Sequence, residues 1–245
     1  MNDADINFYF DPLCPFAWMT SKWVRQVAAQ RDYTVDWRFI SLRMINADID
    51  YDSRFPAGYE AGHTAGLRLL RVAARTRAEH GRRAVGPRYE AIGTQAFDSA
   101  AATTLGAEER GSREFVEPLL GQAGMPAGLA SALDDASWDG EPRAETYEAL
   151  ALTGKDAGTP VIRFGPPGGT AFCGPVISRL PSDQAAIRLR DHVVGLASFP
   201  GFAELKRSLR ERPQLRSFGV RPRRDRHPGG LARQKPAPQE RRLSK

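Results

Sequence analysis

The stretch Phe10-Asp11-Pro12-Leu13-Cys14-Pro15-Phe16-Ala17-Trp18 decides the fold of this 245-residue chain. Before it, the apolar run from Ile6 to Phe10 has the length and composition of a buried strand. After it, Met19, Trp23 and Val27 recur at helical spacing, which predicts a helix over residues 15–30. The stretch is therefore the junction between a first strand and a first helix.

Cys14 lies at this predicted helix start, directly before Pro15. Proline suits the first helical position because its missing N–H group would have no partner there in any case. The free N–H groups and the dipole of a helix start stabilise an anion. We therefore expect the pKa of Cys14 to lie below the value of about 8.5 of a free cysteine, which favours the reactive thiolate.

The next segment completes a βαβ unit. Between Thr34 and Ser41 the apolar side chains of Val35, Trp37 and Phe39 alternate with charged ones, which is the period of a strand with two different faces. Two such strands with a helix between them predict a parallel pair joined by a crossover helix.

Residues 46–155 differ in character, because β-branched runs disappear and alanine, arginine, glutamate and leucine dominate. Apolar residues at helical spacing, separated by glycine and proline turns, predict an all-helical insertion. The expected helices cover residues 65–80, 88–98, 108–123, 127–135 and 143–152.

Strand patterns return after Gly158. Residues 159–164 and 170–173 are two short runs joined by a turn rich in glycine and proline, which predicts an antiparallel hairpin. Ser182 and Asp183 then provide a cap for a helix over 184–196, and a short helix is expected over 199–209. These patterns predict an α/β protein in which the insertion separates a βαβ half from a ββα half.

The formal charge of +6 comes from the end of the chain. Residues 221–245 contain nine lysines and arginines against two acidic residues, a charge of +7, which leaves −1 for the rest. Four prolines and few apolar side chains predict that residues 220–245 form a disordered basic tail. Contact with nucleic acid is expected only through this tail, if at all, and not through the folded part.

No apolar run approaches the roughly 20 residues of a membrane helix, and the first residues do not follow the signal-peptide pattern. We therefore expect a cytoplasmic protein without a membrane partner. Two cysteines and four scattered histidines show none of the spacings of a zinc site, so no metal is expected. No Gly-x-Gly-x-x-Gly turn follows a strand, and so no flavin or nicotinamide site is expected either.

The chain has two notable proline pairs, Cys14-Pro15 at the first helix start and Thr159-Pro160 just ahead of the hairpin. With the order of elements, they make the chain resemble thioredoxin-like proteins of the DsbA type, which carry a helical insertion. Further motifs narrow the resemblance to the mycothiol-dependent nitroreductase and thiol oxidoreductase family. These motifs are Phe10 to Pro15 with Trp18, Thr20-Ser21 and Trp23, then Ser41-Leu42, Gly158-Thr159-Pro160, Phe172 with Gly174-Pro175-Val176, and Phe202 with Glu204-Leu205-Lys206-Arg207.

The resemblance implies a thioredoxin-like domain made of residues 1–45 and 156–219, with residues 46–155 as the insertion. It also implies that Cys14 is the nucleophile and that Pro160 is a cis-proline holding the backbone of Thr159 beside the thiol. The co-substrate would be mycothiol or another low-molecular-weight thiol, and the partner an electrophile or a mixed disulfide. The residues expected to contact the thiol are Pro15, Phe16, Trp18, Thr159, Pro160, Gly174 and Pro175, with Phe16 and Trp18 as walls of the site.

One departure from the family limits this chemistry. Dithiol members carry a second cysteine three residues after the first, where this chain has Ala17. Alanine cannot resolve a mixed disulfide on Cys14, so a second thiol must be supplied from solution. Cys173 could be considered in its place, but the alternation of its neighbours predicts a buried side chain and favours a structural role.

These features favour a monothiol oxidoreductase, in which Cys14 forms a mixed disulfide that a small thiol resolves, with nitro-aromatic compounds or other electrophiles as candidate substrates. Two alternatives stay open. A kappa-type glutathione transferase or 2-hydroxychromene-2-carboxylate isomerase would activate a bound thiol, although such enzymes commonly have serine where Cys14 stands. A non-catalytic binding protein of the DsbA type would not require Cys14 and Thr159-Pro160 together.

Overall fold

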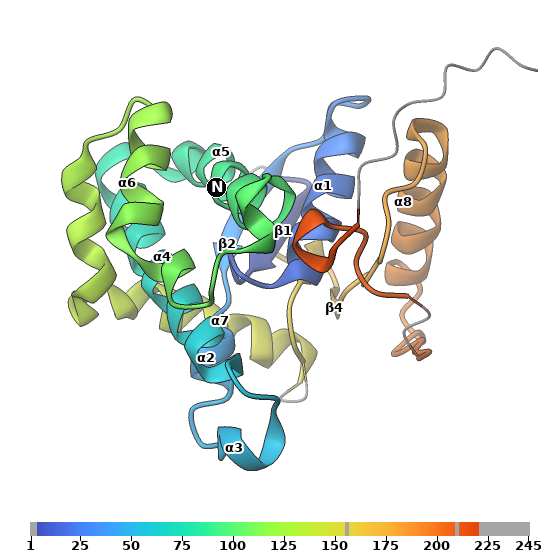
Figure 1. Ribbon diagram of the computed structural model, residues 1–245. Helices are drawn as coiled ribbons and strands as arrows, with labels where there is room; N and C mark the ends of the chain where they lie inside the picture. Colours follow the sequence, from blue (N-terminus) through green and yellow to red (C-terminus); the bar gives the residue numbers. More distant parts are fainter. Residues whose placement is uncertain (1–3, 155–156, 209–210, 221–245) are drawn as a thin grey trace, which may run out of the picture.

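The computed structural model describes residues 4–154, 157–208 and 211–220. Four strands, β1 (Ile6–Phe10), β2 (Val35–Phe39), β3 (Val161–Phe164) and β4 (Ala171–Cys173), form one sheet in the order β2-β1-β3-β4. β1 and β2 are parallel and joined by α1 (Pro15–Ala28), whereas β3 is antiparallel to both of its neighbours. This is the thioredoxin-like topology, which confirms the predicted fold class (Figure 1).

Helices fill the interval between the two halves, as predicted. They are α2 (Leu42–Ile45), α3 (Tyr51–Arg54), α4 (Tyr59–His80), α5 (Val85–Gly93), α6 (Arg113–Gln122) and α7 (Gly140–Thr153). Shorter helical turns connect them: η1 (Arg82–Ala84), η2 (Thr94–Asp98), η3 (Ala101–Thr103), η4 (Glu109–Gly111), η5 (Ala127–Asp134) and η6 (Ala136–Asp139). The segment expected as a helix over 127–135 is the 3₁₀ turn η5, and the domain boundaries remain a prediction.

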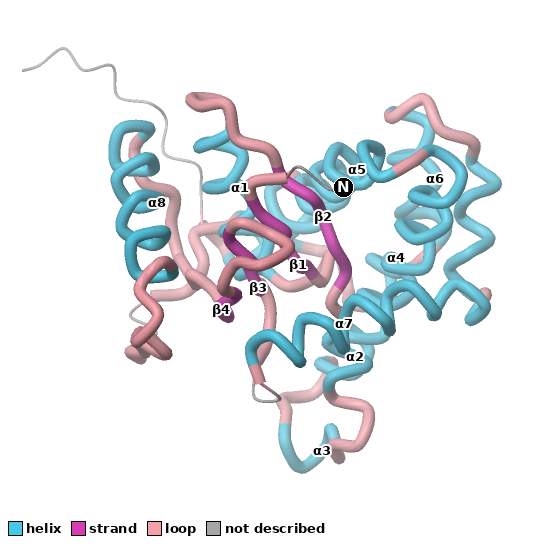
Figure 2. Tube along the Cα trace, turned by 180° about the vertical axis from the view of Figure 1, so that it is seen from behind, coloured by secondary structure: helices cyan, strands magenta, loops and turns pink. Residues whose placement is uncertain are grey.

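The two faces of the sheet are covered differently. Ile6, Phe8 and Phe10 of β1 point to one face and share a large core with α1 and the insertion helices α4, α5 and α6. Tyr9 points to the other face, where it packs with Val161 and with Ala149 of α7. α8 (Asp183–Ala197) lies beside α1 at the side of the molecule remote from α4 and α6 (Figures 1 and 2).

The short helix expected over 199–209 is wrong for residues 199–208, which are turns and irregular chain. Pro200 and Gly201 interrupt the helical pattern at its start. Phe199 and Leu205 are 65% and 82% exposed, so no buried face is present to stabilise a helix. The predicted basic tail over 221–245 lies outside the described residues, and η7 (Arg216–Phe218) is the last helical turn described.

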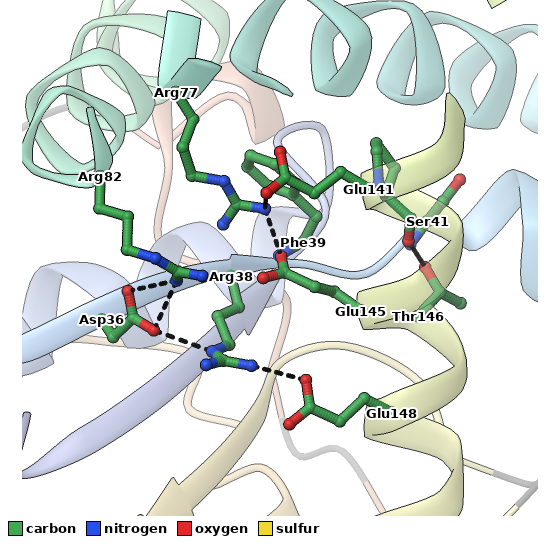
Figure 3. Close-up of polar contacts among 11 residues, drawn as sticks. Asp36, Arg38, Phe39, Ser41, Arg77, Arg82, Glu141, Glu145, Thr146 and Glu148 are labelled. Atoms are coloured by element: carbon green, nitrogen blue, oxygen red, sulfur yellow. Dashed lines mark hydrogen bonds and ion pairs between the residues drawn. The ribbon is translucent and has the colours of Figure 1, made fainter. Parts of the chain in front are cut away.

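Buried charges attach the insertion to the edge strand β2. Arg77 of α4 makes ion pairs with Glu141 and Glu145 of α7, at 2.6 and 3.1 Å, and the Glu145 carboxylate accepts the Phe39 N–H group at 2.8 Å (Figure 3). Alongside, Asp36 of β2 pairs with arginines from the strand itself and from η1. The Arg77–Glu145 pair, whose side chains are only 4% and 8% exposed, therefore joins α4 to α7, and Glu145 in turn holds the end of β2.

Candidate active site

Cys14 occupies the N-cap of α1, with Pro15 as the first helical residue, which confirms the predicted helix start. The Cys14 sulfur accepts the Ala17 N–H group at 3.5 Å. Its S–H group donates to the carbonyl oxygen of Thr159 at 3.6 Å. The sulfur thus lies between the start of α1 and the segment that leads into β3.

Burial controls the ionisation of this thiol. Cys14 is only 6% exposed, and this burial raises its pKa to about 12. The N–H groups of Ala17 and Phe16 lower the pKa, while the negative charge of Asp11 raises it further. The expected low pKa is therefore wrong for this structure, because desolvation of the thiolate outweighs the favourable dipoles of the helix start.

Thr159 and Pro160 meet Cys14 from the other half of the fold. The Thr159-Pro160 peptide bond is cis, and both residues are buried. The Thr159 hydroxyl donates to the Tyr9 carbonyl oxygen at 3.5 Å and accepts the Asp11 N–H group at 3.3 Å. These bonds fix the Thr159 carbonyl relative to the end of β1, and hence relative to Cys14.

Asp11 is a residue of this site to which sequence reasoning gave no role. Its carboxylate accepts the N–H groups of Leu13 and Leu42, both at 3.0 Å, so that it joins the Cys14 loop to the start of α2. It is 1% exposed, and burial raises its pKa to about 6. An aspartate at a strand end, two residues before a backbone N–H group that it could cap, is the signal that could have indicated this role.

The remaining predicted residues divide into two groups. Pro15 and Phe16 are partly buried and directly follow Cys14. Gly174 donates its N–H group to the Pro160 carbonyl oxygen at 2.8 Å, and the Thr20 hydroxyl of α1 donates to the Pro175 carbonyl oxygen at 2.8 Å. The 174–175 segment therefore connects the Pro160 region to α1, close to the place expected for it.

Trp18 does not form an open wall of the site. It is 2% exposed, and its indole N–H group donates to Asp98 of η2 at 3.0 Å. Its ring packs edge-on against Tyr89 and lies so close to Gly93 that a Cβ atom there would approach ring carbon Cε3 to 2.2 Å. Trp18 is therefore packed into the interface with α5.

Cys173 also differs from its expectation, because it is exposed rather than buried. As the last residue of β4, it lies opposite Val161 in the sheet, at an outer strand that no further strand covers among the described residues. An alternating pattern predicts burial only where another element covers that face of the strand. At Cys173, the last residue of β4, the described residues leave the face uncovered.

A separate hollow of about 650 Å³ opens on the insertion between α4 and α6. Its lining includes Leu105, Ser112 and Phe115, and none of the predicted site residues. Within the described residues, no group of three or more histidine, cysteine or acidic side chains is arranged to hold a metal ion. In the same part of the chain, no helix is long and apolar enough to cross a membrane.

A thioredoxin-like fold in which the first helix begins at a cysteine that faces a cis Thr-Pro pair defines the class of thioredoxin-fold thiol proteins. Residues 13–207 match the model of the Rv2466c-like family, described as mycothiol-dependent nitroreductase Rv2466c. The match covers most of the chain, which therefore belongs to this family.

Individual relatives are more distant. The chain is 32% identical over 209 residues to "Uncharacterized protein Rv2286c" of Mycobacterium tuberculosis, a match that covers 82% of this chain and 81% of the relative. Among solved structures, it is similar to the cytosolic disulfide reductase DsbM of Pseudomonas aeruginosa, with 17% identity and a TM-score of 0.45. That match covers 78% of this chain and 99% of the DsbM chain.

Proposed function

We propose that this protein is a thiol-dependent oxidoreductase with Cys14 as its nucleophile and with mycothiol, or another low-molecular-weight thiol, as co-substrate. The observation that carries the proposal is the position of the Cys14 sulfur between the Ala17 N–H group and the Thr159 carbonyl oxygen. The first group stabilises a sulfur anion, and the second can accept an N–H group from a bound substrate.

The proposed cycle needs one protein thiol. The Cys14 sulfur attacks a small-molecule disulfide, a new S–S bond forms, and the leaving thiolate takes up the proton that Cys14 releases. A second small thiol then attacks the mixed disulfide and restores the Cys14 thiol, while its own sulfur ends in a new small disulfide. The alanine at position 17, where dithiol relatives have a cysteine, is consistent with this monothiol cycle.

The hydrogen bond from Cys14 to Thr159 gives the cycle a way to bind its substrate. Once Cys14 has entered a mixed disulfide, it has no proton left to donate, and the Thr159 carbonyl oxygen loses that donor. An amide N–H group of a cysteine-based thiol can take this place. Pro15 and Phe16 follow Cys14 in the chain and would contact the rest of the bound thiol. Pro160, Gly174 and Pro175 are the other residues that we expect to contact it.

The family description also supports an electrophile, in place of the small disulfide, as the acceptor of the electrons. Two small thiols supply two electrons and two protons, which convert a nitro group into a nitroso group and water while the thiols become a disulfide. The proposed compartment is the cytoplasm, since both cysteines are free and the cycle needs a pool of reduced small thiol.

The test is intact-mass measurement after incubation with an oxidised low-molecular-weight thiol, mycothiol disulfide or glutathione disulfide. It uses Cys173→Ser, which leaves Cys14 as the single thiol, and the Cys14→Ser, Cys173→Ser double variant as the matched control. We expect one adduct on the first protein, reversed by free thiol, and none on the second. Absence of the adduct contradicts the proposal, and thiol-dependent turnover that survives Cys14→Ser would instead indicate the isomerase or transferase class.

A further inference from the structure

Cys173 is an exposed thiol that the proposed cycle does not use. In the sheet it pairs with Val161, the first residue of β3, which directly follows Pro160. Directly opposed residues of an antiparallel pair have Cα atoms about 4.5–5.5 Å apart. Cys173 is therefore held beside the same segment whose Thr159 carbonyl oxygen contacts the Cys14 sulfur.

Two further hydrogen bonds hold Cys173 near the start of α1. The next residue, Gly174, donates to the Pro160 carbonyl oxygen, and the residue after that, Pro175, accepts the Thr20 hydroxyl of α1. Thr20 is less than two helical turns from Cys14. The chain after Cys173 thus runs from the cis-proline segment toward the helix that begins at Cys14.

Cys173 is also close enough to Cys14 for a negative charge on it to raise the pKa of Cys14. They differ sharply in access, since Cys14 is 6% exposed whereas Cys173 faces solvent. Because Cys173 ends a strand and is exposed, its side chain can change rotamer without displacing the core.

We propose that Cys173 is a second resolving thiol, which attacks the mixed disulfide on Cys14 when reduced small thiol is scarce. This inference rests on the proposed function. The Cys173 sulfur forms a bond to the Cys14 sulfur, the bond between Cys14 and the small thiol breaks, and the small thiol leaves with the proton of Cys173. The resulting Cys14–Cys173 disulfide is returned to two thiols by two small thiols, which end as a small disulfide.

The experiment follows the adduct by mass after stoichiometric glutathione disulfide, with no free thiol added. We expect the wild-type adduct to disappear at least about tenfold faster than that of Cys173→Ser, because attack within one molecule needs no collision. The product loses two hydrogens, and peptide mapping joins residues 14 and 173. A matched control, Cys173→Ser with Gly121→Cys, places an exposed thiol on the distant α6 and should keep its adduct.

Equal adduct lifetimes in wild type and Cys173→Ser, with no joined peptide, overturn the inference. A parallel treatment with diamide, which oxidises neighbouring thiols directly, separates it from the proposed function. A joined 14–173 peptide with diamide but no adduct from any small disulfide would support the cysteine pair and contradict the proposed small-thiol cycle. An adduct without a joined peptide under either treatment would support the small-thiol cycle and contradict the role of Cys173.

Discussion

The S–H group of Cys14 and the carbonyl oxygen of Thr159 face each other at 3.6 Å, although the two residues are 145 positions apart. The whole insertion lies between them in the sequence, and β1 and β3 bring them together as antiparallel neighbours. Asp11 closes the arrangement, since it binds Thr159 through its N–H group and α2 through its carboxylate. The site thus depends on contacts among both halves of the fold and the start of the insertion.

The pH dependence of Cys14 alkylation tests whether burial dominates its ionisation. With a pKa of about 12, the thiolate fraction rises about tenfold per pH unit throughout the neutral range. In Cys173→Ser, the iodoacetamide rate should therefore climb from pH 6 to pH 9 without a plateau. A rate that levels off within this range would show that the helix start prevails and that the sequence-based expectation was correct.

Asp11 should make the protein more stable as the pH falls toward 4. Its folded pKa of about 6 lies above the ordinary 3.8, so between these values the folded state binds more protons than the unfolded state. Its contribution to the free energy of unfolding should rise by roughly 3 kcal/mol as the pH falls through that window, at 1.36 kcal/mol per unit. Urea unfolding of wild type and Asp11→Asn from pH 7.5 to 4 measures this difference in slope. Parallel slopes would contradict the assignment.

Asp11→Asn should also make Cys14 more reactive at pH 7.5, because the ionised carboxylate raises the pKa of the thiol. The expected effect is a several-fold faster alkylation in the Cys173→Ser background. A slower reaction would mean that the loss of the Leu13 or Leu42 hydrogen bond reorganises the loop.

Gly66 of α4 is the point where the insertion touches the Cys14 loop. A Cβ atom at this position would lie 2.6 Å from Oδ1 of Asp11, whose two hydrogen bonds prevent it from moving away. We expect Gly66→Ala to lower the free energy of unfolding by about 1–3 kcal/mol through overpacking. The control is Gly121→Ala on α6, where the space is open and alanine should stabilise the helix by up to about 1 kcal/mol. Equal effects of both substitutions in urea unfolding would show that no close contact exists at Gly66.

The buried ion pairs between α4 and α7 should matter more for stability than exposed ones. Arg77→Met leaves Glu145 buried without its cation, which is expected to lower the free energy of unfolding by about 3–5 kcal/mol. Arg113→Met is the matched control, since Arg113 is half exposed and lies 3.9 Å from Glu117, so less than about 1 kcal/mol is expected. Chemical denaturation of both variants decides the comparison, and a similarly small loss in both would contradict the larger contribution of the buried pair.

The fold could be predicted because its signals are local. Alternation in β1 and β2, the Cys14-Pro15 helix start and the proline and glycine turns each identify an element within a few residues. What could not be predicted depends on what covers each residue. Trp18 is buried against α5, and Cys173 is exposed at the edge of the sheet. Cys14 is buried deeply enough that its pKa is raised rather than lowered. Burial arises from segments far away in the sequence, which a local pattern does not contain.

Ala17→Cys tests the geometry of the helix start directly. The Ala17 N–H group donates to the Cys14 sulfur at 3.5 Å, so the backbone of residue 17 already lies beside this sulfur. A cysteine there, one turn along α1, should form an intramolecular disulfide with Cys14 on oxidation. The experiment uses the Cys173→Ser background, so that residues 14 and 17 are the only thiols. Peptide mapping and free-thiol titration after diamide treatment should show complete loss of both thiols. Two thiols that persist, or disulfides that join two molecules, would mean that the Cys14 sulfur does not point along the start of α1.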